Sequence, residues 1–375
     1  MRITYLSDTS NWHIGRWAGF FAKRGHDVSI ITWNPEINAD LKHFLDVSAV
    51  RVVEKRASGS GPAARVQNYV SLRREVRRLL KDLRPDVVHA HTSGSYAWMA
   101  MLSGFRPYIV TPWGDDILID AVRSKFAHYM TGLALRRAAL VTTDGYHVQT
   151  VIKDYGLPAE RIPLIMFGVN MRRFNGARDR NTVRAELGLR DEPVIVSTRT
   201  LAPIHDVERF VRAMPLIKEQ APAVRFVVVG DGVQRERLEG LTAELGVTDA
   251  VKFTGRVDEK TLSGLLLAAD IYVSSSVSDA GLASSTAEAM ACGLPVVHAD
   301  NADNREWVSD GNGGFVFPNG DAMALAEAVV RLLKDPALRE RAGKHNRSEI
   351  ERRNNYETEM AKMEDLYRRV STAAS

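Results

Sequence analysis

Short apolar runs alternate with amphipathic segments along almost the whole chain. Runs rich in Val and Ile are typical of buried strands, whereas apolar residues three or four positions apart are typical of helices. Strands are therefore expected at Ile3–Ser7, Val28–Thr32, Pro85–Ala90, Tyr108–Thr111, Ala138–Thr143, Val194–Ser197, Val224–Val229, Val251–Thr254 and Ile271–Ser274. Because helical patterns separate these strands, the sequence predicts an α/β fold with parallel sheets.

The stretch from Ile271 to His298 has the clearest order of elements. A strand is followed by a turn, then by a helix predicted over Ser284–Cys292 with Ser284 or Ser285 as its cap, then by another strand. A turn that leads from a strand into a helix N-terminus is suited to bind an anion, because free backbone N–H groups and the helix dipole point at the ligand.

The same stretch also carries a carboxylate. Glu288 lies about one turn into the predicted helix, where it can accept hydrogen bonds from the two hydroxyls of a ribose. Together with the backbone N–H groups of Gly281, Leu282 and Ala283, it describes a site for a sugar nucleotide. The alternative is an ordinary strand–helix unit of an α/β sheet with a solvated Glu288.

The composition is that of a soluble protein with two cored domains. The chain has 375 residues, of which 45% are hydrophobic and 26% charged. Its single cysteine, Cys292, excludes an internal disulfide and favours a reducing compartment, so a cytoplasmic location is expected. The apolar run near Met1 is too short for a signal peptide, and no run is long enough to span a membrane.

The charge is unevenly distributed. Residues 1–175 contain 24 Lys and Arg against 15 Asp and Glu, a net charge of +9, while the remainder has a net charge of −5. A helix predicted over Arg65–Leu83 has one basic face, which is either simply solvated or a contact with an anionic membrane surface. We expect an anionic partner, but not a nucleic acid, because no aromatic-interleaved basic motif or zinc module is present.

Several segments resemble one enzyme family. The segment GLASSTAEAMACGLPVV resembles the donor-binding segment of the family 4 retaining glycosyltransferases, and VVHAH and FGVNMRRF resemble other parts of these enzymes. The resemblance implies a GT-B fold, in which two Rossmann-like domains face each other across a cleft. It implies an acceptor-binding domain at 1–172, a nucleotide-sugar-binding domain at 173–350, and a C-terminal helix at 351–375 that crosses back to the first domain.

The resemblance also implies a donor site in the second domain. In the family an Arg and a Lys six residues later hold the diphosphate, the nucleotide base packs against backbone, and a Glu binds the ribose. Carried over to this chain, the donor-binding residues are Arg199, His205, Gly230, Arg256, Val257, Asp279, Gly281, Leu282, Ala283 and Glu288.

Two of these positions depart from the family pattern. His205 stands where the Lys is expected, and a histidine is only partly cationic at neutral pH, so Arg199 should carry more of the phosphate attraction. The family has an acid eight positions before the Glu that matches Glu288, but in this chain that position is Ala280. The nearest acid, Asp279, lies one residue earlier. Either the turn is rearranged so that Asp279 reaches the transferred sugar, or that contact is lost.

The acceptor is expected in the first domain. The resemblance places His91 near the transferred sugar, and it makes His91, Arg199 and Asp279 the candidate catalytic residues. The first turn lacks the usual glycines, so Asn11 and His13 are candidate side-chain donors there. His89 and His91 share a strand face as a metal pair would, but no third ligand is evident.

The segment TPWGDD adds three further candidates for the acceptor. Trp113 is expected beside the acceptor. Asp115 and Asp116 either orient an acceptor hydroxyl or take its proton, or they cap the following helix.

The expected reaction is transfer of a sugar from a UDP- or GDP-type donor to a glycan or lipid-linked acceptor, with retention, in polysaccharide or glycolipid biosynthesis. No Asp-x-Asp pair is seen, so the resemblance implies no metal and no cofactor besides the nucleotide sugar. A lipid-linked acceptor would place the protein at the inner face of the cytoplasmic membrane. The alternatives are a GT-B sugar-nucleotide epimerase and a non-catalytic nucleotide-sugar-binding module.

Overall fold

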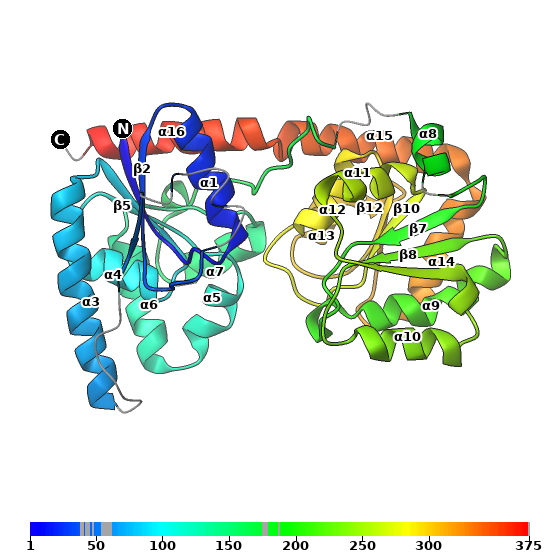
Figure 1. Cartoon of the computed structure of the whole chain (residues 1–375), viewed down its shortest axis with the longest axis horizontal. Helices are drawn as coiled ribbons and strands as arrows, with labels where there is room; N and C mark the ends of the chain where they lie inside the picture. The colour runs from blue at the N-terminus through cyan, green and yellow to red at the C-terminus, as the bar shows by residue number, and fades with distance from the viewer. Residues whose placement is uncertain are drawn as a thin grey trace. The chain divides into compact units, whose positions relative to one another are not determined.

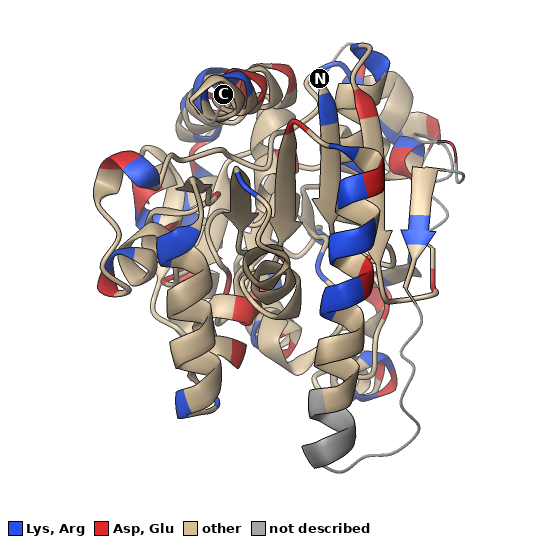
Figure 2. Ribbon diagram, turned by 90° about the vertical axis from the view of Figure 1, so that its left-hand side faces the viewer, with Lys and Arg blue, Asp and Glu red and all other residues tan. Residues whose placement is uncertain are grey.

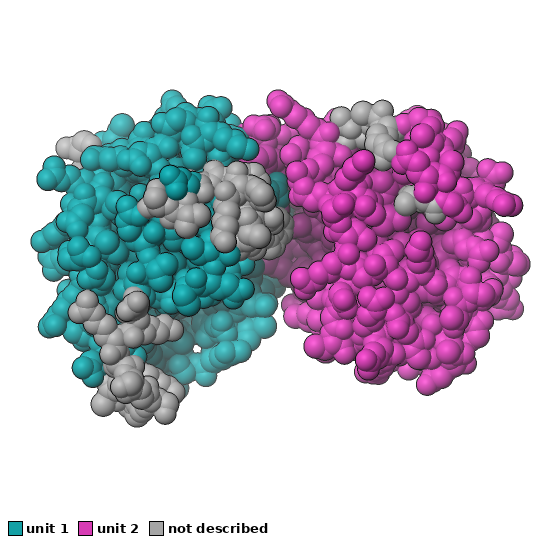
Figure 3. Space-filling view, in the orientation of Figure 1, with its two compact units in different colours: residues 1–165, 359–375 teal, residues 166–358 magenta. Residues whose placement is uncertain are grey.

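The chain folds into two compact units in a computed structural model (Figure 3). The structure describes residues 1–37, 41, 46, 49–53, 62–174, 179–186 and 188–373. Unit 1 comprises Met1–Ile165 and Glu359–Ser375, and unit 2 comprises Met166–Thr358. The boundaries implied by the family resemblance lie close to these: the first is after residue 172 instead of Ile165, and the second is after residue 350 instead of Thr358.

Unit 1 is built around a parallel sheet with the strand order β3-β2-β1-β4-β5-β6. The order reverses between β1 and β4, and ligands of open α/β sheets bind outside the carboxyl ends of the strands at such a point. The strands are β1 (Arg2–Leu6), β2 (Asp27–Thr32), β3 (Val50–Val52), β4 (Val87–His91), β5 (Tyr108–Thr111) and β6 (Leu140–Val141).

The helices of unit 1 cover both faces of this sheet (Figure 1). Helix α3 begins at Pro62, slightly before the predicted Arg65, and its Val76 and Leu80 are buried against the unit. The helical segments are α1 (Trp12–Lys23), α3 (Pro62–Leu83), α4 (Ser95–Ser103), α5 (Asp115–Leu118), η2 (Asp120–Val122), α6 (Lys125–Arg137), α7 (Tyr146–Asp154), η3 (Ala159–Arg161) and α16 (Tyr356–Thr372).

The C-terminal helix α16 completes the core of unit 1. Its Met360, Met363 and Tyr367 are fully buried. The Tyr367 hydroxyl lies 2.6 Å from Nδ1 of His89 and 3.1 Å from the hydroxyl of Tyr5. These bonds satisfy polar groups that would otherwise be buried without partners, so they attach the last helix of the chain to its first strand.

Unit 2 contains a seven-stranded parallel sheet in the order β12-β13-β11-β10-β7-β8-β9. The chain moves outward from β7 to β9, then returns to β10 beside β7 and moves the other way. The order therefore reverses between β7 and β10. The strands are β7 (Val194–Ser197), β8 (Arg225–Val229), β9 (Val251–Gly255), β10 (Ile271–Ser274), β11 (Val296–Ala299), β12 (Ser309–Asp310) and β13 (Gly313–Phe317).

One face of this sheet packs on α9 and α14, and α12 and α15 lie on the other face (Figure 1). Alternate residues of β8, β10 and β11 form an apolar core with α9, which is the pattern expected of strands buried on both faces. The helical segments are α8 (Arg180–Glu186), η4 (Pro203–His205), α9 (Val207–Gln220), α10 (Arg235–Glu244), η5 (Thr248–Ala250), α11 (Glu259–Ala268), α12 (Ser284–Ala291), α13 (Asn304–Trp307), α14 (Ala322–Lys334) and α15 (Pro336–Arg353).

The predicted α/β class with two parallel Rossmann-like sheets is confirmed. Within the described residues, no helix combines the length and hydrophobicity needed to cross a bilayer. The prediction that Ser284 or Ser285 caps α12 is wrong. The N-cap is Ala283, which has no side chain to accept a hydrogen bond, and Ser285 instead accepts one from Arg199.

Candidate functional site

The predicted donor-binding residues gather at the carboxyl ends of the strands of unit 2. Arg199 follows β7 and Asp279 follows β10, the two strands between which the strand order reverses. Because neighbouring parallel strands end at the same edge, residues 80 positions apart in the sequence meet there. The strand order thus explains why the loops that carry this pair lie at the same edge of the sheet.

The centre of this group is the guanidinium of Arg199. Its Nη2 donates to the carboxylate of Asp279 at 2.6 Å and to Oγ of Ser276 at 3.2 Å, and lies 2.8 Å from Nδ1 of His205. Its Nη1 donates to Oγ of Ser285 at 3.1 Å. The Arg199 side chain is only 9% exposed, so these contacts largely replace water around the charge. We call these five side chains the Arg199 cluster.

His205 belongs to this cluster as a neutral group. Burial and the charge of Arg199 lower the pKa of His205 to about 4, against a smaller opposing effect of Asp279. At neutral pH the imidazole therefore carries no charge, and its Nδ1 can accept the proton of Arg199. Arg199 is thus the one cation of the cluster, and its expected larger share of the phosphate attraction stays a prediction.

Helix α12 directs its N-terminus to the same edge of the sheet. Gly281, Leu282 and Ala283 form the loop that leads into its first turn, and Leu282 and Ala283 are partly exposed. Glu288 lies in the second turn of α12 and is also partly exposed. The first turn of α12 therefore presents its backbone N–H groups at this edge, and Glu288 lies one turn further along the helix.

The backbone of Gly230 lies against the backbone of Arg199. Its φ angle is +128°, and a Cβ atom at Gly230 would lie 2.3 Å from the carbonyl oxygen of Arg199. Only glycine fits this approach. The Gly230 N–H also donates to the carbonyl of Gly255 at 2.9 Å, so the loop that carries Arg256 and Val257 lies beside it.

In unit 1, the predicted acceptor residues gather at the carboxyl edge next to β1 and β4. Asn11 caps α1 by accepting a hydrogen bond from the backbone N–H of His13 at 3.0 Å. The imidazole of His13 stacks on the indole of Trp113, with ring centroids 4.5 Å apart and planes 6° from parallel. The Asn11 oxygen is thus used within the protein, and His13 and Trp113 form one aromatic surface.

His91, at the end of β4, is buried beneath this surface. Its ring contacts those of Tyr5, Trp17 and Trp113, with centroids 5.0–5.3 Å apart. Neither ring nitrogen has a hydrogen-bond partner in the described part of the chain. Burial, and secondarily His89 and His13, hold the pKa of His91 well below its usual range. His91 is therefore neutral, with two polar atoms that an entering hydroxyl could satisfy.

Asp116 and Asp115 differ sharply in environment. The Asp116 carboxylate accepts backbone hydrogen bonds from Trp113 at 2.8 Å and from Ser93 at 2.5 Å, so it ties the loops after β4 and β5 together. Burial raises the pKa of Asp116, and these hydrogen bonds oppose the shift. The Asp115 side chain is exposed at the start of α5. Asp116 thus positions the loop, whereas Asp115 is accessible to an acceptor.

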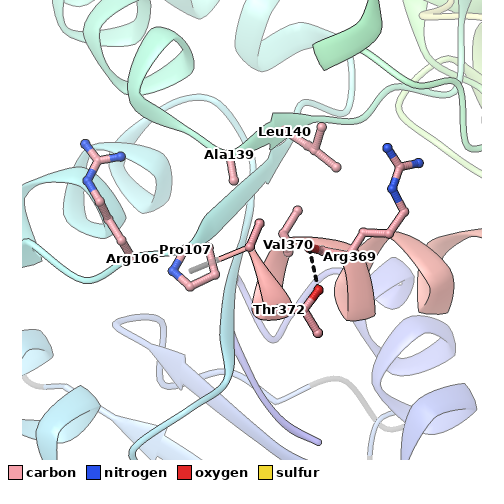
Figure 4. Close-up of a pocket in the computed structure, with 8 residues that line it drawn as sticks. Arg106, Pro107, Ala139, Leu140, Arg369, Val370 and Thr372 are labelled. Carbon is pink, nitrogen blue, oxygen red and sulfur yellow. Dashed lines mark hydrogen bonds between the residues drawn. The ribbon is translucent and has the colours of Figure 1, made fainter. Parts of the chain in front are cut away.

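A cavity of about 560 Å³ lies at the other end of the unit 1 sheet, between the starts of β5 and β6 and the last turn of α16 (Figure 4). Leu140 and Val370 give it apolar walls beside Arg106 and Arg369. It contains none of the predicted acceptor residues. Among the described residues, no group of three or more His, Cys, Asp or Glu side chains is arranged to hold a metal ion.

Sequence reasoning missed two members of the Arg199 cluster, Ser276 and Ser285. Ser276 accepts from Arg199 and lies 3.2 Å from Nδ1 of His205, and Ser285 accepts from the other end of the guanidinium. The run of three serines after Val273 was the available signal. Hydroxyls directly after a buried strand are well placed to line a polar site.

Comparisons with known proteins place the chain among sugar-transferring enzymes. The family "Glycosyl transferases group 1" matches residues 179–349, and "Glycosyl transferase 4-like" matches residues 2–145. The alpha-D-kanosaminyltransferase of Streptomyces kanamyceticus is 30% identical over 71% of this chain and 73% of its own length. The phosphatidyl-myo-inositol mannosyltransferase of Mycobacterium leprae is 26% identical over 97% of this chain and 93% of its own.

Solved structures have the same fold. The Anabaena protein HepE in complex with UDP superposes with a TM-score of 0.80 at 19% sequence identity, covering 98% of this chain and 99% of that one. At this identity the match establishes the architecture.

Proposed function

Since this chain belongs to the family 4 glycosyltransferases, which have the GT-B fold, we propose that it transfers a sugar from a nucleoside diphosphate donor with retention of configuration. Unit 2 binds the donor and unit 1 the acceptor. The donor is of the UDP or GDP type, and the site needs no metal ion. The observation that carries this proposal is the enclosed Arg199 guanidinium beside the N-terminus of α12.

The physical basis is charge stabilisation. As the glycosidic bond breaks, the leaving diphosphate gains negative charge. Arg199 and the free N–H groups of the first turn of α12 stabilise this charge without the metal ion that other transferases use. The leaving phosphate then receives the acceptor proton, so no carboxylate is needed as a nucleophile. In unit 1, the exposed Asp115 is the residue that contacts the acceptor hydroxyl, while His91 lies buried beneath the surface formed by His13 and Trp113.

The ribose contact gives the first prediction. Replacing Glu288 with alanine should weaken binding of the preferred nucleotide sugar by about 10- to 100-fold, because a charged acceptor of the ribose hydroxyls is lost. The measurement is thermal unfolding with a panel of nucleotide sugars. A donor at about 100 times its dissociation constant should stabilise the wild-type protein by about 2.7 kcal/mol.

The control for this experiment is Glu244→Ala, which removes an exposed carboxylate from the last turn of α10 in the same unit. This variant should keep the full stabilisation by the donor. If no nucleotide sugar stabilises the wild-type protein, the transferase proposal is wrong. Equal stabilisation of wild type and Glu288→Ala would remove Glu288 from the site.

We further propose that the acceptor is a glycan or a lipid-linked molecule, and that the enzyme binds it at the inner face of the cytoplasmic membrane. The pathway would be polysaccharide or glycolipid biosynthesis. Lys and Arg lie along α3, the helix whose first turn is grey in Figure 2. Arg77, Lys81 and Arg84 line a cavity of about 450 Å³ with Arg2, and these three have no ion-pair partner in the described part of the chain. In contrast, the neighbouring Arg78 pairs with acids on its own helix.

Aromatic side chains adjoin this basic face. The rings of Tyr69 on α3 and Trp98 on α4 have centroids 6.3 Å apart, and Trp98 contacts Phe126 of α6 at 5.9 Å. Phe126 is 65% exposed and Tyr129 is 59% exposed. Aromatic rings beside Lys and Arg are typical of surfaces that lie at a bilayer interface.

The membrane contact can be tested by vesicle co-sedimentation. Each Lys or Arg near an anionic bilayer contributes about 1 kcal/mol, so Arg77→Gln with Lys81→Gln should weaken partitioning by roughly 30-fold. The matched control is Arg341→Gln with Lys344→Gln on α15, which makes the same charge change on unit 2. Wild-type binding that does not depend on the fraction of anionic lipid would contradict the proposal.

A further inference from the structure

The Arg199 cluster contains an anion of its own. Asp279 binds Arg199 through a 2.6 Å ion pair, and the Asp279 side chain is only 14% exposed. Arg199 is the residue on which the proposed function relies for the donor diphosphate. The Asp279 carboxylate therefore occupies the Arg199 guanidinium, which a phosphate of the donor would need.

The charges of the cluster sum to zero. Arg199 contributes one positive charge and Asp279 one negative charge, while Ser276 and Ser285 are neutral. Burial keeps His205 neutral as well, where the family pattern has a second cation. Consequently the Arg199 cluster offers an incoming diphosphate no net positive charge as long as Asp279 stays on Arg199.

The guanidinium can nevertheless exchange one anion for another. Nη2 of Arg199 makes three of the four side-chain contacts of the guanidinium, whereas Nε is buried and has no partner in the described part of the chain. Asp279 itself lies in a stretch without helix or strand between Ser274 and Ser284. Arg199 thus keeps an unused donor, and Asp279 is carried by a loop rather than by a helix or a strand.

We propose that Asp279 is an internal substitute for the donor diphosphate, which the donor displaces when it binds. This inference rests on the proposed function of unit 2. Once displaced, the Asp279 carboxylate is free to accept hydrogen bonds from hydroxyls of the transferred sugar. An intact nucleotide sugar recovers the cost of breaking the ion pair through these bonds, but a free nucleoside diphosphate does not. Asp279 therefore acts as a specificity-determining residue that favours the intact donor over the spent nucleotide.

The test is the variant Asp279→Asn, which keeps the shape of the side chain and removes its charge. Isothermal titration with UDP and GDP should show about tenfold tighter binding of the preferred diphosphate than in wild type, because the competing anion is gone. The affinity for the corresponding nucleotide sugar should increase by a smaller factor, or fall below that of wild type, because the contact with the sugar is impaired. A loss of packing alone would weaken both ligands together.

Two further variants make the result decisive. Asp300→Asn removes one negative charge at the end of the neighbouring strand β11, from an exposed pair with Arg305, and should leave both affinities unchanged. Asp279→Ser repeats the test if the Asn variant does not fold. If wild type binds a diphosphate and neither Asp279 variant binds it more tightly, the inference is wrong. If wild type binds no nucleoside diphosphate or nucleotide sugar, the proposed function fails as well.

Discussion

Replacing Arg199 with alanine should reduce kcat/KM for sugar transfer by about 10²- to 10³-fold, the effect of removing one preorganised donor to a developing negative charge. Arg199 is the one cation of its cluster, since His205 is neutral there, so no neighbouring side chain of the cluster can replace it. The measurement is the initial rate with the donor identified by the thermal panel.

Arg199→Lys separates charge from geometry in the same assay. Lysine keeps the positive charge but lacks the planar fork that reaches Asp279 and Ser285 at once, so an intermediate loss is expected. Thermal unfolding of each variant without ligand shows whether the cluster still folds. A folded Arg199→Ala enzyme with kcat/KM within threefold of wild type would exclude Arg199 from the reaction.

Unit 1 should lose stability steeply in mild acid. Burial, reinforced by Arg16, lowers the pKa of His13 to about 3, burial lowers that of His89 to about 3, and His91 is held well below its usual range. In the unfolded chain all three become protonated below about pH 6.5. The unfolded state thus binds more protons, and the free energy of unfolding falls as the pH decreases.

The size of this effect follows from proton linkage. Each buried histidine contributes about 1.4 kcal/mol per pH unit, so three contribute about 4 kcal/mol per unit between roughly pH 6 and pH 4. The effect can be measured by urea unfolding monitored by tryptophan fluorescence. This signal reports mainly on unit 1, because five of the six tryptophans precede residue 166.

Two variants test the assignment to these histidines. His91→Leu removes one buried titrating group, so the pH slope should decrease by about 1.4 kcal/mol per unit whatever its effect at pH 7.5. His147→Asn changes an exposed histidine of the same unit and should leave the slope unchanged. A wild-type unfolding free energy that is flat between pH 6.5 and pH 5 would contradict the prediction.

Most of the architecture could be predicted from the sequence, because strands and helices depend mainly on local patterns of apolar and polar residues. The apolar run Val224–Val229 predicts a buried parallel strand, and β8 is found at Arg225–Val229 with four buried residues. A C-terminal helix, which the resemblance implied within 351–375, is also found as α16, and its Met360, Met363 and Tyr367 are buried. The resemblance of the segment around Glu288 identified the family.

The interactions within the sites were not encoded locally. Nothing in the sequence near Asp279 indicates that it pairs with Arg199, since the pairing depends on which strands become neighbours and on how two loops bend. The same is true of the bond between Tyr367 and His89, which are 278 positions apart. The cap of α12 was mispredicted because a serine at the start of a helix suits both capping and binding a side chain.

The position of α16 has a consequence for how the protein is made. A ribosome completes the first 165 residues early, yet the core they form also requires Met360, Met363 and Tyr367 from the end of the chain. Unit 2 emerges in full before unit 1 has all of its parts. During synthesis, unit 1 therefore starts before unit 2 but is completed after it, and until α16 emerges its core lacks these three buried side chains.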